Sequence, residues 1–237
     1  MFRELIDIFQ PNNSLRAMSV NFEEMLRVTL QMNLKAGQIF FGECNDTEDI
    51  SNIHRQDAEV NALERVIRRQ VITHLALPGN QADIPYCLLL ISLAKDVERL
   101  GDYAKNLSEI SEVRPHMMDK SESSEELLEI RQSVESAFRI TSEVFLDSDR
   151  NKAVQLIDEG RKVARRCDKL IRAIGRADYD AGTAVSLILG SRYYKRIGGH
   201  LLNVLSSVVM PLDKIDYYDE SEIDADLILK GAPYIEH

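Results

Sequence analysis

Two sets of long segments with apolar residues at helical spacing constrain the fold of this chain more than any single motif. Within each segment the apolar residues recur at three- and four-residue steps, which is the period of one helix face. LPGNQAD at 77–83 and GRADYDAG at 175–182 break the chain at matching places in its two halves, because Gly, Pro, Asn and Asp favour turns. The expected helices cover about residues 15–41, 46–77, 85–113, 124–146, 150–174 and 181–209.

The second half of the chain repeats features of the first half at a constant shift of 97 residues. The residues that coincide are Arg99 with Arg196, Gly101 with Gly198, and Asn106 with Asn203. A glycine inside a helix costs about 1 kcal/mol relative to alanine and needs a reason. We therefore expect an internal duplication, with close helix approach at Gly101 and Gly198.

These patterns predict an all-α fold of two tandem three-helix bundles with an acidic C-terminal tail. Ser123 and Glu126 form a candidate capping box at the start of the fourth helix. From residue 213 onward the chain has eight acids and two lysines. The expected parts are an N-terminal arm (1–14), a first repeat (15–113), a linker (114–123), a second, degenerate repeat (124–212) and the acidic tail (213–237).

Composition and charge exclude several classes of function. The formal net charge is -10 and the sequence shows no obvious basic stripe, so a nucleic-acid partner is not expected. The three cysteines lie far apart and no secretory segment precedes the first helix, which suits reduced thiols in the cytoplasm. The longest nearly apolar run, at 87–94, is too short to span a bilayer. Contact with a membrane is therefore expected only through a partner.

Motifs that carry common enzymatic chemistry are absent from the sequence. It contains no GxxxxGK[ST], GxGxxG, GxSxG or HExxH motif, and no Glu precedes a His by three residues. Phosphate-cradling loops, nucleophile elbows, zinc-protease helices and ferritin-like di-iron sites are therefore not predicted. We do not expect an enzyme.

The third predicted helix carries the clearest candidate site. Glu98 and Asp102 are four residues apart, so they point the same way. Oxygen ligands of this kind suit Mg, Ca, Mn or iron. Asp57, Asn61 and Glu64 share one edge of the second helix, and they would face the first pair if the two helices pack side by side.

A simpler interpretation competes with a metal site. The charged residues Lys95, Glu98, Asp102, Lys105 and Glu109 are three or four residues apart. Pairs of opposite charge at this spacing stabilise a solvated helix face by about 0.2–0.5 kcal/mol each. Spacing alone favours this solvated ladder over a site.

Three segments of the first half resemble the PhoU family of phosphate-uptake regulators. They are AKDVERLGDYAKNLSEI at 94–110, RQDAEVNALERVIRR at 55–69 and LPGNQADIPYCLLLISL at 77–93. The Glu-Arg-x-Gly-Asp core in this helical context is the most specific part. The resemblance extends over most of residues 15–212 and is weaker in the second half.

The resemblance implies a fold and a mode of action. PhoU-like proteins are tandem three-helix bundles that act in the bacterial cytoplasm, some at the inner membrane through partners, and they are not known as enzymes. The implied partners are a phosphate transporter component, either an ABC ATPase or a sodium–phosphate cotransporter, and a sensor histidine kinase. A homodimer is also expected.

The resemblance also implies a divalent or iron-type metal ion bound through an acidic motif in each repeat. Carried over to this chain, the first-repeat ligands are Glu98 and Asp102, with contributions from Asp96, Asp57 and Glu59. The second repeat has Lys195 and Gly199 at the motif positions, and we predict that these do not bind metal. Two alternatives stay open, namely a metal-binding bundle for ion sensing or storage and a generic helical adaptor.

Overall fold

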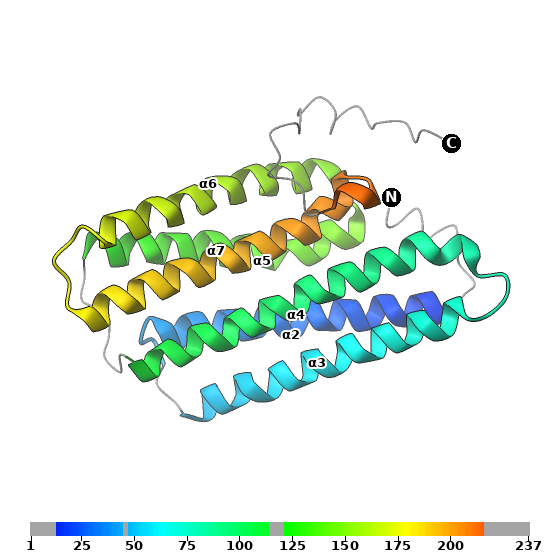
Figure 1. Cartoon of the computed structure of the whole chain (residues 1–237), viewed down its shortest axis with the longest axis horizontal. Helices are drawn as coiled ribbons and strands as arrows, with labels where there is room; N and C mark the ends of the chain where they lie inside the picture. The colour runs from blue at the N-terminus through cyan, green and yellow to red at the C-terminus, as the bar shows by residue number, and fades with distance from the viewer. Residues whose placement is uncertain (1–12, 45–46, 114–120, 216–237) are drawn as a thin grey trace.

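The computed structural model describes residues 13–44, 47–113 and 121–215, and six long helices make up most of this part of the chain (Figure 1). Short 3-10 turns lie at Gln81–Asp83 (η1) and Leu212–Lys214 (η2). The long helices are α2 (Asn13–Phe40), α3 (Thr47–Leu75), α4 (Ile84–Val113), α5 (Glu122–Asp147), α6 (Arg150–Ile174) and α7 (Ala181–Val209).

The helices form two three-helix bundles that lie side by side. In Figure 1, α2, α3 and α4 make up the lower bundle, and α5, α6 and α7 make up the upper bundle. The bundles meet where α4 packs on α7 and α2 packs on α5. No strand occurs in the described part of the chain. The all-α prediction of two three-helix bundles is confirmed, while the N-terminal arm before Asn13 and the acidic tail after Ile215 lie outside the described residues.

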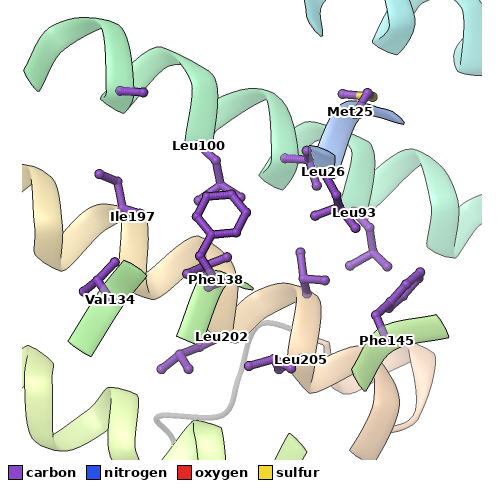
Figure 2. Packing of buried hydrophobic residues seen from close by; sticks show 14 of the residues in the cluster. Met25, Leu26, Leu93, Leu100, Val134, Phe138, Phe145, Ile197, Leu202 and Leu205 are labelled. Atoms are coloured by element: carbon purple, nitrogen blue, oxygen red, sulfur yellow. The ribbon is translucent and has the colours of Figure 1, made fainter. Parts of the chain in front are cut away.

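One apolar core continues from the first bundle into the second. Figure 2 shows Leu100 of α4 pointing towards Phe138 of α5, with Ile197 of α7 nearby, and all three side chains are buried. At the α2–α5 contact the ring centroids of Phe22 and Phe145 are 5.1 Å apart. Each fully buried side chain of this size contributes about 1.5–3 kcal/mol. Burial of apolar surface therefore joins the bundles into a single folding unit.

Contacts between α4 and α7 follow an approximate two-fold symmetry. Asp96 Oδ1 lies 2.7 Å from His200 Nδ1, and the rings of Tyr103 and Tyr193 have centroids 6.0 Å apart. The 97-residue shift takes Asp96 to Tyr193 and Tyr103 to His200. Each contact is therefore the counterpart of the other under exchange of the two bundles, as at an isologous interface. This arrangement supports the predicted duplication.

The start of α5 corrects the predicted capping box. Ser121 is the N-cap, and its Oγ accepts a hydrogen bond from the Ser124 backbone N–H while Ser124 Oγ accepts from the Ser121 N–H. The prediction that Ser123 and Glu126 form the box was wrong. Because Glu122 already belongs to α5, the helix also begins slightly earlier than the predicted linker 114–123 allows.

Neither glycine shared by the two repeats marks a close helix approach. A Cβ on Gly101 would lie 3.6 Å from Met32 Cε and Thr29 Cγ2, and a Cβ on Gly198 would lie 3.9 Å from Val134 Cγ2. These are ordinary van der Waals distances, so the close approach predicted at Gly101 and Gly198 is wrong.

The tight helix contacts occur at other glycines. A Cβ on Gly190 of α7 would lie 2.4 Å from Phe40 Cζ, and one on Gly160 of α6 would lie 2.6 Å from Leu202 Cδ2. Gly190 therefore allows α7 to accept an aromatic side chain from the first bundle. Gly160 allows α6 and α7 to pack closely within the second bundle.

Candidate functional site

Two carboxylates and one ammonium form a compact charged cluster between α3 and α4. Lys105 Nζ donates a hydrogen bond to Asp57 Oδ2 at 2.8 Å and lies 3.5 Å from Asp102 Oδ1. All three side chains are mostly withdrawn from solvent, and that of Asp57 is only 13% exposed. The sequence prediction that acids of the second and third helices face each other is confirmed for Asp57 and Asp102.

The lysine at the centre of this cluster is held in its charged form. Partial burial alone would lower the pKa of Lys105, but the hydrogen bond to Asp57 and the charges of Asp57 and Asp102 outweigh it and raise that pKa. The cluster therefore contains its own cation at neutral pH.

Glu98 belongs to a second set of ion pairs on α4. Its Oε2 lies 2.6 Å from Lys95 Nζ and 3.8 Å from Arg99 Nε, while Arg99 also donates to Asp102 Oδ2 at 2.8 Å. The predicted ladder of opposite charges therefore exists. It is not a fully solvated face, however, because Glu98 is only 8% exposed.

Asp96 and Glu59 lie apart from the Asp57–Asp102–Lys105 cluster. Asp96 Oδ1 accepts a hydrogen bond from Asn203 Nδ2 at 2.7 Å and contacts His200, so it faces the second bundle. Glu59 is exposed on α3, and its charge helps to raise the pKa of Arg27 on α2. The five predicted ligands are thus divided among four places.

The arrangement of these acids does not fit a bound metal ion. Within residues 13–44, 47–113 and 121–215, no group of three or more His, Cys, Asp and Glu side chains is placed to hold a metal. Lys105 Nζ lies between Asp57 and Asp102, where a bound cation would have to lie. A lysine ammonium has no acceptor for a metal and brings its own positive charge. The predicted metal ion stays a prediction that this geometry does not favour.

The corresponding positions of the second bundle carry different chemistry. Lys195 Nζ contacts both carboxylate oxygens of Asp168 on α6, at 2.6 and 2.7 Å. Lys195 is therefore paired with an acid of its own bundle. Gly199 contributes no side chain.

A hollow of about 1060 Å³ lies in this second bundle, lined by α5, α6 and α7. Several of its lining residues are small, among them Gly160, Ala164, Gly198 and Gly199. We call it the α5–α6–α7 hollow. Its basic lining residues are Arg161, Lys162, Arg166, Arg192, Lys195 and Arg196.

This basic character corrects the sequence-based statement that the chain has no basic stripe. Helix α6 carries eight Lys and Arg residues against three acids, and α7 carries three against none. The acids of α5 and of the C-terminal segment offset this positive charge, so it is not visible in the net charge of -10 for the whole chain. A helix-by-helix charge count would have found it.

Exposed apolar residues gather at the other bundle, where α3 turns into α4. The turn is held by buried His74, whose Nε2 lies 2.6 Å from Asp83 Oδ2. Four large apolar side chains near this turn are exposed by 41–69%. We call them the α3–α4 apolar tip, and they are Ile72, Leu77, Ile84 and Leu88.

No helix in the described ranges is long and apolar enough to cross a membrane. This finding agrees with the short apolar run noted at 87–94 in the sequence.

Comparisons with known proteins identify a matching family model and two similar structures. Residues 22–111 match the family model described as the PhoU domain. The structure is similar to that of the phosphate transport system regulatory protein PhoU from Streptococcus pneumoniae, with a TM-score of 0.71 at 16% identity, covering 89% of this chain and 97% of that one. It is also similar to PhoU from Pseudomonas aeruginosa, with a TM-score of 0.65 at 18% identity, covering 83% and 92% of the two chains. No curated protein sequence matched the chain.

Proposed function

Because the chain carries a PhoU domain at residues 22–111 within a fold shared with two PhoU proteins, we propose that it regulates phosphate transport or phosphate signalling by binding other proteins. The family match carries this proposal. The match covers α3 and α4, which contain the charged cluster and the α3–α4 apolar tip.

A non-enzymatic role is consistent with the chemistry of the charged groups. Asp57, Asp102 and Glu98 are each paired with a lysine or arginine of the same bundle. Side chains that neutralise one another in this way are poorly suited to acid–base or nucleophilic work, which needs a group poised to gain or lose a proton.

The proposed partners are a component of a phosphate transporter and a sensor histidine kinase. The transporter component is an ABC ATPase or a sodium–phosphate cotransporter. Such partners would hold the protein in the cytoplasm at the inner face of the membrane. Self-association as a homodimer is part of the same proposal.

The α3–α4 apolar tip is the surface best suited to this contact. Exposed apolar side chains gathered in one place commonly mark protein interfaces. The buried His74–Asp83 contact fixes the turn, and Asn80 Nδ2 donates to the His74 carbonyl at 2.8 Å. A rigid turn lowers the conformational cost of binding.

The decisive experiment is co-purification from the source organism. A tagged full-length chain is recovered from detergent-solubilised cells, and its partners are identified by mass spectrometry. We expect the ATPase or cotransporter of a phosphate transporter, the sensor kinase, or both. Failure to recover any of them from cells grown in high and in low phosphate would overturn the proposal.

A pair of variants tests whether the α3–α4 apolar tip binds the partner. Leu88→Glu places a charge in the apolar tip, at a side chain 52% exposed, and should reduce the recovered partner at least tenfold. Val185→Glu makes the same kind of change in α7, at a residue 44% exposed, and should leave recovery unchanged. Equal losses in both variants would argue against a contact at the tip.

The amount of metal bound to the purified protein distinguishes an ion-sensing role from regulation through protein partners. A sensing role would require a metal to displace Lys105 from Asp57 and Asp102. Metal analysis of the protein purified without chelators should give well under one equivalent, and a full equivalent lost in Asp57→Asn would favour the sensing role instead.

A further inference from the structure

The basic lining of the α5–α6–α7 hollow is only partly neutralised by neighbouring acids. Arg166 pairs with Glu126 and Glu129, and Lys195 pairs with Asp168. Arg192 and Arg196 are exposed, and no described residue forms an ion pair or hydrogen bond with either of them. The hollow therefore has positive charge available for an anionic partner.

The lining changes in character along α7. Because α7 runs antiparallel to α6, Lys195 lies near Asp168 whereas Leu202 lies near Gly160. The part of the hollow nearer the end of α7 contains the apolar residues Leu156, Leu202 and Leu205 together with Arg161 and Lys162, which follow Gly160 on α6. The far part contains Arg192, Lys195 and Arg196.

The hollow is too large for a single small anion and suits an extended polypeptide. Its volume of about 1060 Å³ lies slightly above the range of ordinary ligand pockets, which is about 300–1,000 Å³. Gly198, Gly199 and Gly160 contribute no side chains to fill it. An extended chain with apolar or aromatic residues first and acids afterwards would match both parts of the lining.

The chain itself has a segment of this composition directly after the described residues. Residues 216–226 read DYYDESEIDAD, with two tyrosines near the start, six acids and no basic residue. Met210 and Ile215 are buried in the core, so this segment begins at a fixed point beyond the end of α7. Leu205, which lines the hollow, lies only four residues before that end.

The segment is long enough to reach Arg192 and Arg196. From Val209 back to Arg192, α7 spans about 26 Å at 1.5 Å per residue. An extended chain covers about 3.3 Å per residue, so about eight residues are sufficient. Residues 216–237 provide 22.

We propose that the α5–α6–α7 hollow binds the acidic segment 216–226 of the same chain, with its acids at Arg192 and Arg196. The inference is independent of the proposed function. It assigns the hollow a polyanionic peptide ligand, and an acidic partner protein could reach the hollow only by displacing this segment.

Zero-length carbodiimide cross-linking of the full-length protein tests the inference, with cross-linked peptides mapped by mass spectrometry. This reagent joins only carboxylates and lysines that touch. The Lys195–Asp168 contact of 2.6 Å gives an internal reference. We expect cross-links from the acids of 216–226 to Lys162 or Lys195 at low salt, reduced at least fivefold relative to the reference in 0.5 M NaCl.

Charge reversal supplies the matched control. Arg192→Glu/Arg196→Glu should reduce these cross-links at least fivefold. Arg55→Glu/Arg65→Glu, at two exposed arginines of α3, makes the same change in net charge and should leave them unchanged. Circular dichroism melting of each variant checks that the helices are intact.

Two results would overturn the proposal. In a mixture of ¹⁴N- and ¹⁵N-labelled protein, cross-links between light and heavy peptides would show that the segment binds a neighbouring copy. Absence of cross-links from 216–226, or their equal distribution over Lys35 and Lys105, would show that the hollow does not bind the segment.

Discussion

The two bundles have the same helix arrangement, but their helices are joined by different kinds of side-chain contact. In the first bundle, Asp57 of α3 and Lys105 of α4 contact each other through a hydrogen-bonded ion pair at 2.8 Å. The 97-residue shift takes Lys105 to Leu202, and Leu202 packs against Gly160 of α6. The position that forms an ion pair in one bundle is thus occupied by a leucine packed on a glycine in the other.

The difference shows which features the fold requires. Both bundles keep three long helices with buried apolar residues on their inner faces. The polar contacts at equivalent positions are exchangeable, because an apolar pair of suitable shape can replace a buried ion pair at little cost. The charged cluster is therefore not needed for the architecture.

The exchange also alters the surface that each bundle offers. In the first bundle, Asp102 and Glu98 are neutralised by adjacent cations. In the second, Gly199 and Lys195 occupy the equivalent positions, and an open hollow with excess positive charge results. The two bundles thus differ by one carboxylate and one reversed charge at these positions.

The largest expected effect comes from moving the acid of the first bundle into the second. Gly160→Asp would place its Cβ 2.6 Å from Leu202 Cδ2 and add a carboxylate beside an apolar side chain. Overpacking costs about 1–3 kcal/mol, and a poorly paired charge adds to it. We expect the free energy of unfolding, measured by urea denaturation, to fall by about 3 kcal/mol or more.

The double variant Gly160→Asp/Leu202→Lys places an acid and a lysine at this contact and is the matched control. It should recover at least about 1 kcal/mol of the loss, the size of coupling between contacting residues. A Gly160→Asp variant as stable as the unmodified protein would show that the Gly160–Leu202 contact does not require a glycine.

The next largest loss of stability is expected from a substitution at the contact between the bundles. Asp96 is buried, and Asp96→Ala removes the acceptor for Asn203 Nδ2 and the neighbour of His200 Nδ1. Leaving buried polar groups without partners costs about 1–3 kcal/mol, so we expect a loss of about 2 kcal/mol in urea denaturation. Asp96→Asn keeps one acceptor oxygen and should lose less. If the two variants are equally stable, the hydrogen bond to Asn203 contributes nothing.

A smaller loss is expected when the cation of the first bundle is removed. Lys105→Met leaves Asp57 without its main partner and should lower the free energy of unfolding by about 1–2 kcal/mol at pH 7, because the site is partly exposed. Asp57→Leu/Lys105→Met removes both charges, imitates the second bundle and should recover most of the loss.

The same pair gives a pH dependence with a defined sign. The pKa of Lys105 is raised above its ordinary 10.5 in the folded state. The stabilisation from its charged form is therefore complete below pH 10.5 and is lost as pH rises through the folded-state pKa. The stability difference between the unmodified protein and Lys105→Met should shrink as pH rises above 10.5. A difference that does not change with pH would mean that the charge of Lys105 is not responsible.

Sequence periodicity was sufficient to predict the helices. Predicted segments such as 150–174 and 181–209 agree with α6 and α7, because long helices with regular apolar spacing and Gly- or Asp-rich breaks leave few alternatives. The cap of α5 was harder to predict, since the serines at 121, 123 and 124 offer several registers for the same chemistry.

The partners of individual acids could not be predicted. Asp96, Glu98 and Asp102 lie within two turns of one helix, yet each has different partners. Asp96 contacts α7, and Glu98 contacts Lys95 of α4. Asp102 contacts Lys105 and Arg99. A one-residue step rotates a side chain by about 100°, so the rotation of α4 between its two neighbouring bundles decides each contact. The spacing of residues along one helix does not reveal how that helix is rotated relative to its neighbours.

The smallest expected effects concern the glycine that the two repeats share. Gly101→Ala and Gly198→Ala should each raise the free energy of unfolding by about 0.5–1 kcal/mol, because alanine favours a helix and a Cβ fits at 3.6 and 3.9 Å from its nearest neighbours. Gly190→Ala is the contrasting control. Its Cβ would lie 2.4 Å from Phe40 Cζ, so it should destabilise by about 1–3 kcal/mol.

The outcome separates packing from function at these positions. A destabilised Gly101→Ala variant would show that α2 and α4 cannot adjust to one added methyl group, and that close approach matters after all. A stabilised variant that no longer co-purifies with a transporter or kinase would show that the glycine is kept for a partner. Because the helix gains stability from alanine, a glycine retained in both repeats against that gain requires a cause outside the folded chain.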